Sequence, residues 1–213
     1  MSVAAKLLVN EPATAARASF IFAHGAGAAM DTAFMNFIAE GLAAQYSIRC
    51  VRFEFPYMAA RRVTGKRRAP DRPEVLKNAF LECLPRKEDT CVFIGGKSMG
   101  GRIASLLASE VRPAGVICLG FPLHSAGKPV NGERLECLKS ISVPTCICQG
   151  TRDTMGNQGE IESIAWPELI QWHWLEDGDH SFKPRKASGH TIEDHLQTAL
   201  EKTGEFIIKH SST

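Results

Sequence analysis

The sequence contains no apolar run long enough to cross a membrane, and its start is also short of apolar residues. Only the three-residue stretch Leu7–Val9 precedes the polar residues Asn10 and Glu11, so we expect neither a secretory signal nor a membrane span. The formal net charge is only +2, and the 8% of aromatic residues do not alternate with basic ones, which argues against nucleic acid as the principal ligand. We therefore expect a soluble, cytoplasmic protein.

Cysteines are too few and too irregular for a disulfide framework. There are seven, an odd number, and Cys91, Cys118, Cys146 and Cys148 lie in apolar runs, where a thiol behaves as a small buried hydrophobe. Cys146 and Cys148 could suggest a metal site, but we expect the two thiols to point to opposite faces of a strand. The sequence therefore predicts no metal and no cofactor.

The order of apolar patterns indicates one α/β domain spanning residues 1–213. With 213 residues and 44% hydrophobic content, the chain is long enough for one well-buried core. Strand-like runs alternate with helical patterns, which predicts a mostly parallel sheet covered by helices on both faces. The expected strands are Ser19–Ala23, Ile48–Phe55, Cys91–Ile94, Gly115–Leu119, Thr145–Cys148 and Leu169–Leu175, with Lys6–Val9 as an edge strand. The expected helices are Thr32–Tyr46, Glu74–Leu84, Met99–Val111, Gly132–Ser140, Gly159–Ala165 and Ile192–Ile208.

The segment Ile94–Gly101 has the pattern of a nucleophile elbow, in which a serine lies at a sharp turn between a strand and a helix. Gly96 and Gly100 flank Ser98 at the two positions where a Cβ would collide with neighbouring backbone. A phosphate-binding loop ending in Gly-Lys-Ser is the alternative, but its first glycine would have to be Cys91, within the strand. A chance match of the short pattern is the other alternative.

Residues with complementary chemistry follow two later strands. Ser98, Asp153 and His180 occur in the order nucleophile, acid, base, and each lies just beyond a predicted strand. In this interpretation His180 takes the proton of Ser98, and Asp153 orients the imidazole. Asp153 could instead be an ordinary turn residue. We expect turn roles for Asp177 and Asp179, a packed or edge position for His173, and surface positions for His190, His195 and His210.

Two backbone amides are candidates for stabilising a negatively charged carbonyl oxygen. Met99 directly follows the serine, and Ala26 lies between Gly25 and Gly27, where the backbone can approach a substrate closely. The alternative for the second position is a plain glycine-rich turn between a strand and a helix.

Taken together, these motifs resemble the α/β-hydrolase superfamily over nearly the whole chain. More narrowly, the sequence is similar to the small lidless subgroup related to the testis-expressed α/β-hydrolase-like proteins. The resemblance implies Ser98 as nucleophile, Asp153 as acid and His180 as base, with no lid domain. The residues that carry it are His24–Gly27, Phe55–Met58, Gly96–Arg102, Gly120–His124, Gly127–Pro129, Gly150–Asp153 and Gly178–His180.

We therefore expect a serine hydrolase acting on a small carboxylic ester or thioester without a cofactor; a non-catalytic interaction module and an amidase or peptidase remain alternatives. The short segment Phe121–Gly132 and the absence of long insertions predict an open site. A basic run over residues 61–72 suggests a preference for anionic substrates, with a solvated loop as the alternative. The candidate acyl pocket, which could equally be core packing, is Tyr57, Met58, Phe121 and Leu123, and the candidate anion contacts are Arg67, Lys128 and Lys183–Lys186. The sequence does not predict the oligomeric state.

Overall fold

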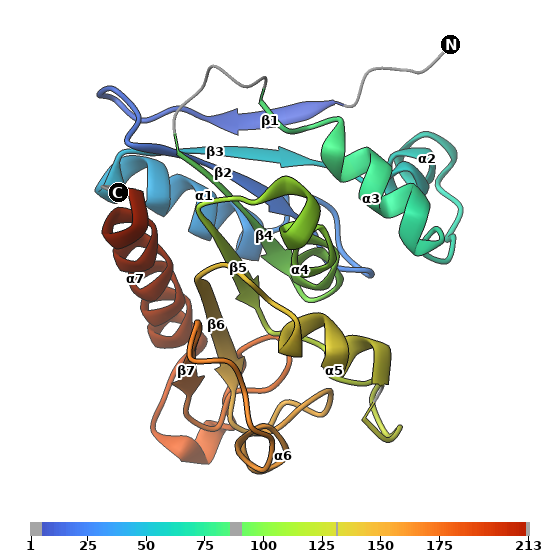
Figure 1. Cartoon of the computed structure of the whole chain (residues 1–213), viewed down its shortest axis with the longest axis vertical. Helices are drawn as coiled ribbons and strands as arrows, with labels where there is room; N and C mark the ends of the chain where they lie inside the picture. Colours follow the sequence, from blue (N-terminus) through green and yellow to red (C-terminus); the bar gives the residue numbers. More distant parts are fainter. Residues whose placement is uncertain (1–5, 86–90, 131, 212–213) are drawn as a thin grey trace.

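A seven-stranded sheet forms the centre of the molecule in the computed structural model, which describes residues 6–85, 91–130 and 132–211 (Figure 1). Residues 1–5, part of the segment in which no secretory signal is expected, lie outside the described residues. The strand order is β1-β3-β2-β4-β5-β6-β7, and every neighbouring pair is parallel except β1 with β3. The strands are β1 (Leu7–Asn10), β2 (Ala18–Ala23), β3 (Ile48–Phe53), β4 (Val92–Lys97), β5 (Gly115–Leu119), β6 (Thr145–Gly150) and β7 (Ile170–Leu175).

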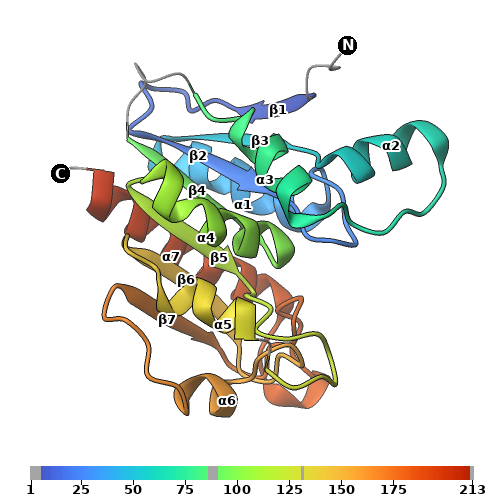
Figure 2. The ribbon, with the colours of Figure 1, turned by 45° about the vertical axis from the view of Figure 1, so that its right-hand side comes forward.

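Helices cover both faces of this sheet (Figures 1 and 2). α1 (Ala33–Tyr46) and α7 (Ile192–Ser211) lie on one face. α3 (Pro73–Leu81), α4 (Met99–Val111) and α5 (Gly132–Lys139) lie on the other. The short helices α2 (Pro56–Thr64) and α6 (Gln158–Glu162) and a 3-10 turn (Lys186–Ser188) lie in connections. Within the described part of the chain, no helix is both long and apolar enough to span a bilayer.

The two-sided cover explains the near-continuous apolar runs in the strands. Every residue of β2 is buried, and its side chains alternate between the two cores. Phe20 and Phe22 pack beneath α1 and α7, whereas Ile21 and Ala23 pack beneath α4. Successive residues of a strand point to opposite faces, so a strand with helices on both sides must be apolar at every position.

The expected strands and the edge strand at Lys6–Val9 are confirmed, with small shifts of their ends. Between β3 and α3, the helix α2 occupies much of what was expected to be a loop. α2 begins at Pro56, which suits the first helical turn, and ends at Gly65, whose φ of 68° closes the helix. Because this helix buries only Tyr57 and Met58, its apolar pattern is too short to detect in the sequence.

The carboxyl ends of the parallel strands meet along one edge of the sheet, and the loops that follow them lie side by side. β4 lies between β2 and β5. The loop after β2 therefore lies beside the turn at Ser98, and the loops after β6 and β7 reach the same edge. The candidate triad and oxyanion residues belong to these loops, whereas the candidate acyl-pocket residues follow β3 and β5.

Candidate active site

Ser98 lies at a strained turn between β4 and α4. Its φ of 51° and ψ of −113° are unusual for a residue that carries a side chain. The turn is possible because the backbone packs closely around it. A Cβ added to Gly96 would lie 2.4 Å from the carbonyl oxygen of Ala23, and one added to Gly100 would lie 2.5 Å from the same atom. The two glycines therefore allow the turn that holds the serine hydroxyl out of the sheet.

Ser98, His180 and Asp153 form a continuous hydrogen-bonded chain. The Nε2 atom of His180 lies 2.7 Å from the Ser98 hydroxyl oxygen, and its Nδ1 atom lies 2.7 Å from Oδ2 of Asp153. An ionised carboxylate can only accept, so the imidazole proton belongs on Nδ1 and the lone pair of Nε2 faces the hydroxyl. Asp153 is fully buried, whereas the His180 side chain keeps 24% of its surface exposed. The arrangement suits proton transfer from serine to histidine.

Gln149 fixes the buried carboxylate, and it is a site residue that the sequence analysis missed. Its Nε2 atom donates to Oδ2 of Asp153 at 2.9 Å and to the carbonyl of Gly156 at 2.9 Å. Its Oε1 atom accepts from the backbone of Phe121 at 2.7 Å. The amide of Met155 donates to the other carboxylate oxygen at 2.8 Å. The sequence feature that could have identified Gln149 is its position as a lone amide side chain at the end of the apolar run Thr145–Gln149.

Two carboxylates that precede His180 in the chain hold the loop that carries it. Oδ1 of Asp179 accepts from the amides of Ser181 and Lys183, and Asp177 accepts from the backbone and side chain of Arg185. The hydrogen bonds from Arg185 lower the pKa of Asp177. The turn roles expected for Asp177 and Asp179 are confirmed.

Two further side chains tie this loop to the rest of the molecule. Nζ of Lys97 donates to the carbonyl of His180 at 2.6 Å and lies 5.2 Å from the ring centre of Phe182. Desolvation lowers the pKa of Lys97 to about 8. The expectation that His195 lies at the surface is wrong, because it is buried beside the same loop and its Nδ1 donates to Phe182 at 2.7 Å.

The candidate oxyanion donors lie on either side of the serine. Met99 is the first residue of α4, where backbone N–H groups have no partner within the helix. On the other side, a Cβ added to Gly25 would lie only 3.6 Å from Cβ of Ser98. The Gly25 carbonyl accepts from Nδ1 of His24 at 2.7 Å. Because a trans peptide is planar, the N–H of Ala26 points the opposite way, away from His24.

His24 holds the peptide between Gly25 and Ala26 in its orientation. It is fully buried, and burial lowers its pKa, which favours the neutral ring. Nε2 accepts from the amide of Phe55 at 3.1 Å, so the single ring proton belongs on Nδ1, where it bonds Gly25. The hydroxyl of Tyr57 adds a hydrogen bond to the Ala26 carbonyl at 2.9 Å.

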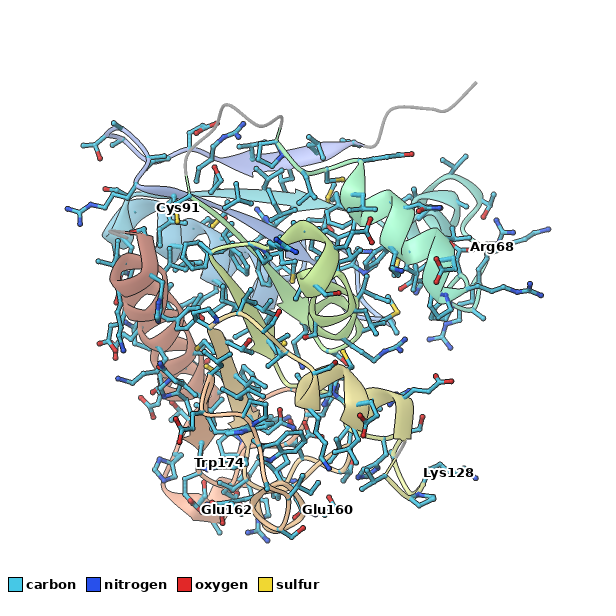
Figure 3. All side chains as sticks on the ribbon, in the orientation of Figure 1. Arg68, Cys91, Lys128, Glu160, Glu162 and Trp174 are labelled. Atoms are coloured by element: carbon cyan, nitrogen blue, oxygen red, sulfur yellow. The ribbon has the colours of Figure 1, made fainter. Side chains whose placement is uncertain are left out.

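The expected substrate contacts lie in two different settings. Tyr57, Met58, Phe121 and Leu123 are at most 3% exposed. Arg67 and Lys128 are exposed. Figure 3 shows Lys128, together with Arg68 next to Arg67, at the periphery of the molecule. Binding of an anionic substrate group by these side chains stays a prediction.

The expectation that Cys146 and Cys148 point to opposite faces is wrong. Both thiols lie in the core beneath α7, because residues two apart on a strand share one face. A hydrogen bond with Cys148 and burial both raise the pKa of the Cys146 thiol. Among the residues that the structure describes, no group of three His, Cys, Asp or Glu side chains could hold a metal ion.

Comparisons with known proteins agree with this architecture. The family model described as an alpha/beta hydrolase domain matches residues 16–208. A serine hydrolase without a lid from Xanthomonas campestris is 17% identical, with a TM-score of 0.66 over 94% of this chain and 88% of that one. Dienelactone hydrolase from Anabaena variabilis is 18% identical, with a TM-score of 0.73 over 98% and 93% of the two chains. Est1E from Butyrivibrio proteoclasticus, solved with ferulic acid bound, is 14% identical, with a TM-score of 0.70 over 96% of both chains. The protein therefore belongs to the α/β-hydrolase family.

Proposed function

We propose that this protein is a serine hydrolase that cleaves a small carboxylic ester or thioester through an acyl-enzyme intermediate on Ser98. One observation carries the proposal. Two hydrogen bonds of 2.7 Å connect the buried carboxylate of Asp153, through His180, to a serine hydroxyl at a strained turn. A connected acid, base and nucleophile is what serine hydrolysis requires.

The proposed reaction has two halves. The Ser98 oxygen attacks the carbonyl carbon while Nε2 of His180 takes its proton, and the N–H groups of Met99 and Ala26 stabilise the oxyanion. Collapse of the tetrahedral intermediate breaks the bond to the leaving alcohol or thiol, which receives the proton from His180. Water then attacks the acyl group, giving its proton to His180. The acid departs, and the proton returns to Ser98.

The shared fold and the local motifs support this proposal. The lidless serine hydrolase and the dienelactone hydrolase share this fold, and both are named as hydrolases. Their names do not indicate the substrate of this protein. The segments Phe55–Met58 and Gly120–His124 further support a place in the small lidless subgroup related to the testis-expressed α/β-hydrolase-like proteins.

Replacing Ser98 by alanine tests the proposal directly. We expect Ser98→Ala to abolish labelling by a fluorophosphonate and to lower ester turnover by on the order of a millionfold, to the background of the assay. Ser109, an exposed serine on α4, provides the matched control, because Ser109→Ala should keep both labelling and turnover. Turnover by purified Ser98→Ala above a trace would refute the assignment.

A further inference from the structure

A largely apolar cavity of about 450 Å³ opens between the start of α1, the start of α7 and the loop after β2. This volume lies within the range of about 300 to 1,000 Å³ that is typical of small-molecule sites. Its apolar walls come from Ala28, Ala29, Ala33, Phe34, Ile192 and Leu196. None of the residues expected to form an acyl pocket lines it.

The cavity is lined by the sequence neighbours of the proposed reacting residues, although neither Ser98 nor His180 itself lines it. Its lining includes Gly25 of the candidate oxyanion loop, Lys97 and Ser181. Lys97 directly precedes Ser98, and Ser181 directly follows His180. A Cβ built on Gly25 would lie 3.6 Å from Cβ of Ser98, which shows how close this wall comes to the nucleophile. A substrate whose carbonyl lies at Ser98 can therefore extend into the cavity.

Two of the polar side chains around the cavity, Lys97 and Thr32, already have partners in the protein. The ammonium of Lys97 donates to the His180 carbonyl at 2.6 Å and lies 5.7 Å from the ring centre of Phe34, so mainly its alkyl stem is available. The Thr32 hydroxyl caps α1 by accepting from Met35. Glu193 lies on an exposed turn of α7. Because Lys97 and Thr32 are engaged and the exposed Glu193 carries a negative charge, the cavity favours an apolar occupant over an anion.

The residues expected to form the acyl pocket are packed in the protein interior and do not line this cavity. Tyr57, Met58 and Phe121 belong to the core cluster beneath α4, and Leu123 is 1% exposed. Side chains this deeply packed leave little volume for a substrate chain. The cavity beside Gly25 and Lys97 offers that volume next to the same serine.

We infer that this cavity binds an unbranched apolar chain of the ester substrate, in either its acyl or its alcohol part. The inference rests on the proposed hydrolase function and adds the substrate class. Each methylene that leaves water for the cavity should favour the reaction, because apolar burial strengthens binding in the transition state.

Two ester series measure this effect and identify which part of the ester is bound. One holds the alcohol constant and lengthens the acyl chain from acetyl to decanoyl, and the other lengthens the alcohol of an acetate in the same steps. We expect kcat/KM to rise about fourfold per methylene in one series until the cavity is full. Labelling rates with fluorophosphonates of graded alkyl length provide a second readout.

Substitutions on α1 and α7 locate the effect in the cavity. Ala33→Trp places an indole in it and should lower the ratio of kcat/KM for hexanoyl over acetyl substrates, or the equivalent alcohol ratio, by at least tenfold. Ala44 lies on the same helix, is also exposed and does not line the cavity, so Ala44→Trp should keep the wild-type ratio. Leu196→Ala enlarges the cavity and should move the optimum to longer chains.

The possible failures are distinguishable. A wild-type protein that is labelled at Ser98 and hydrolyses acetyl esters, but shows no gain with length in either series, overturns the cavity assignment alone. An unchanged ratio in folded Ala33→Trp does the same. A wild-type protein that hydrolyses no ester and is not labelled at Ser98 overturns the proposed function, and the role of the cavity falls with it.

Discussion

Replacing His24 by alanine tests whether a buried imidazole orients the candidate oxyanion loop. The ring donates to the Gly25 carbonyl at 2.7 Å and accepts from the Phe55 amide at 3.1 Å, and no part of it reaches solvent. Without the ring, the Gly25 carbonyl keeps only a long contact of 3.4 Å with the Tyr57 hydroxyl, which already bonds Ala26. The peptide that carries the candidate oxyanion donor Ala26 N–H then loses its main constraint.

The expected size of the effect follows from these contacts. Each buried polar group left without a partner costs about 1 to 3 kcal/mol, so His24→Ala should lower the free energy of unfolding by roughly 2 to 6 kcal/mol. Loss of one oxyanion donor should lower kcat by about 100-fold to 1,000-fold. In His24→Asn, the side-chain amide can replace the Nδ1 donor but cannot reach Phe55. This variant should keep kcat within about tenfold of the wild type, because the oxyanion donor is preserved, and lose about 1 to 3 kcal/mol for Phe55 alone.

Steady-state hydrolysis of p-nitrophenyl acetate and urea unfolding measure the two effects separately. Circular dichroism at the assay temperature establishes that each variant is folded. A folded His24→Ala with kcat within threefold of the wild type would refute the orienting role. Equal losses of kcat in the alanine and asparagine variants would also refute it, since only the asparagine variant preserves the bond to Gly25.

Two further predictions concern buried groups near the site. Gln149→Met leaves the Phe121 amide and the Gly156 carbonyl without this partner, so urea unfolding should show a loss of on the order of 3 kcal/mol; an unchanged midpoint would contradict the network. Because burial lowers the pKa of His24 from 6.5, the unfolded chain takes up a proton below about pH 6.5 that the folded chain resists. The free energy of unfolding should therefore fall as the pH drops through that range. Unfolding at pH 7.5 and 5.0 should show a smaller fall for His24→Asn, and equal falls would exclude His24 as a contributor.

Local patterns in the sequence predicted the α/β fold and the nucleophile elbow at Ser98. The alternation of strands and helices follows from apolar periodicity, which two-sided burial imposes on each strand. Gly96 and Gly100 identified the turn at Ser98 because steric limits on the backbone act between near neighbours. Asp153 and His180 could be proposed as partners because loops after parallel strands gather at one edge of the sheet.

Tertiary structure alone decided which side chains meet across that edge. The hydrogen bonds of His180 with Ser98, of Gln149 with Phe121 and of His24 with Phe55 join residues 82, 28 and 31 positions apart in the chain, and no periodicity encodes these contacts. The same packing buried Tyr57 and Phe121, which the sequence suggested for substrate, and left an apolar cavity beside Lys97. The sequence by itself thus determined the sheet, the turn and the order of the reactive residues. Burial and hydrogen-bond partners depend on segments distant in the chain, so only the folded molecule decided how these residues are held and where an apolar cavity lies beside them.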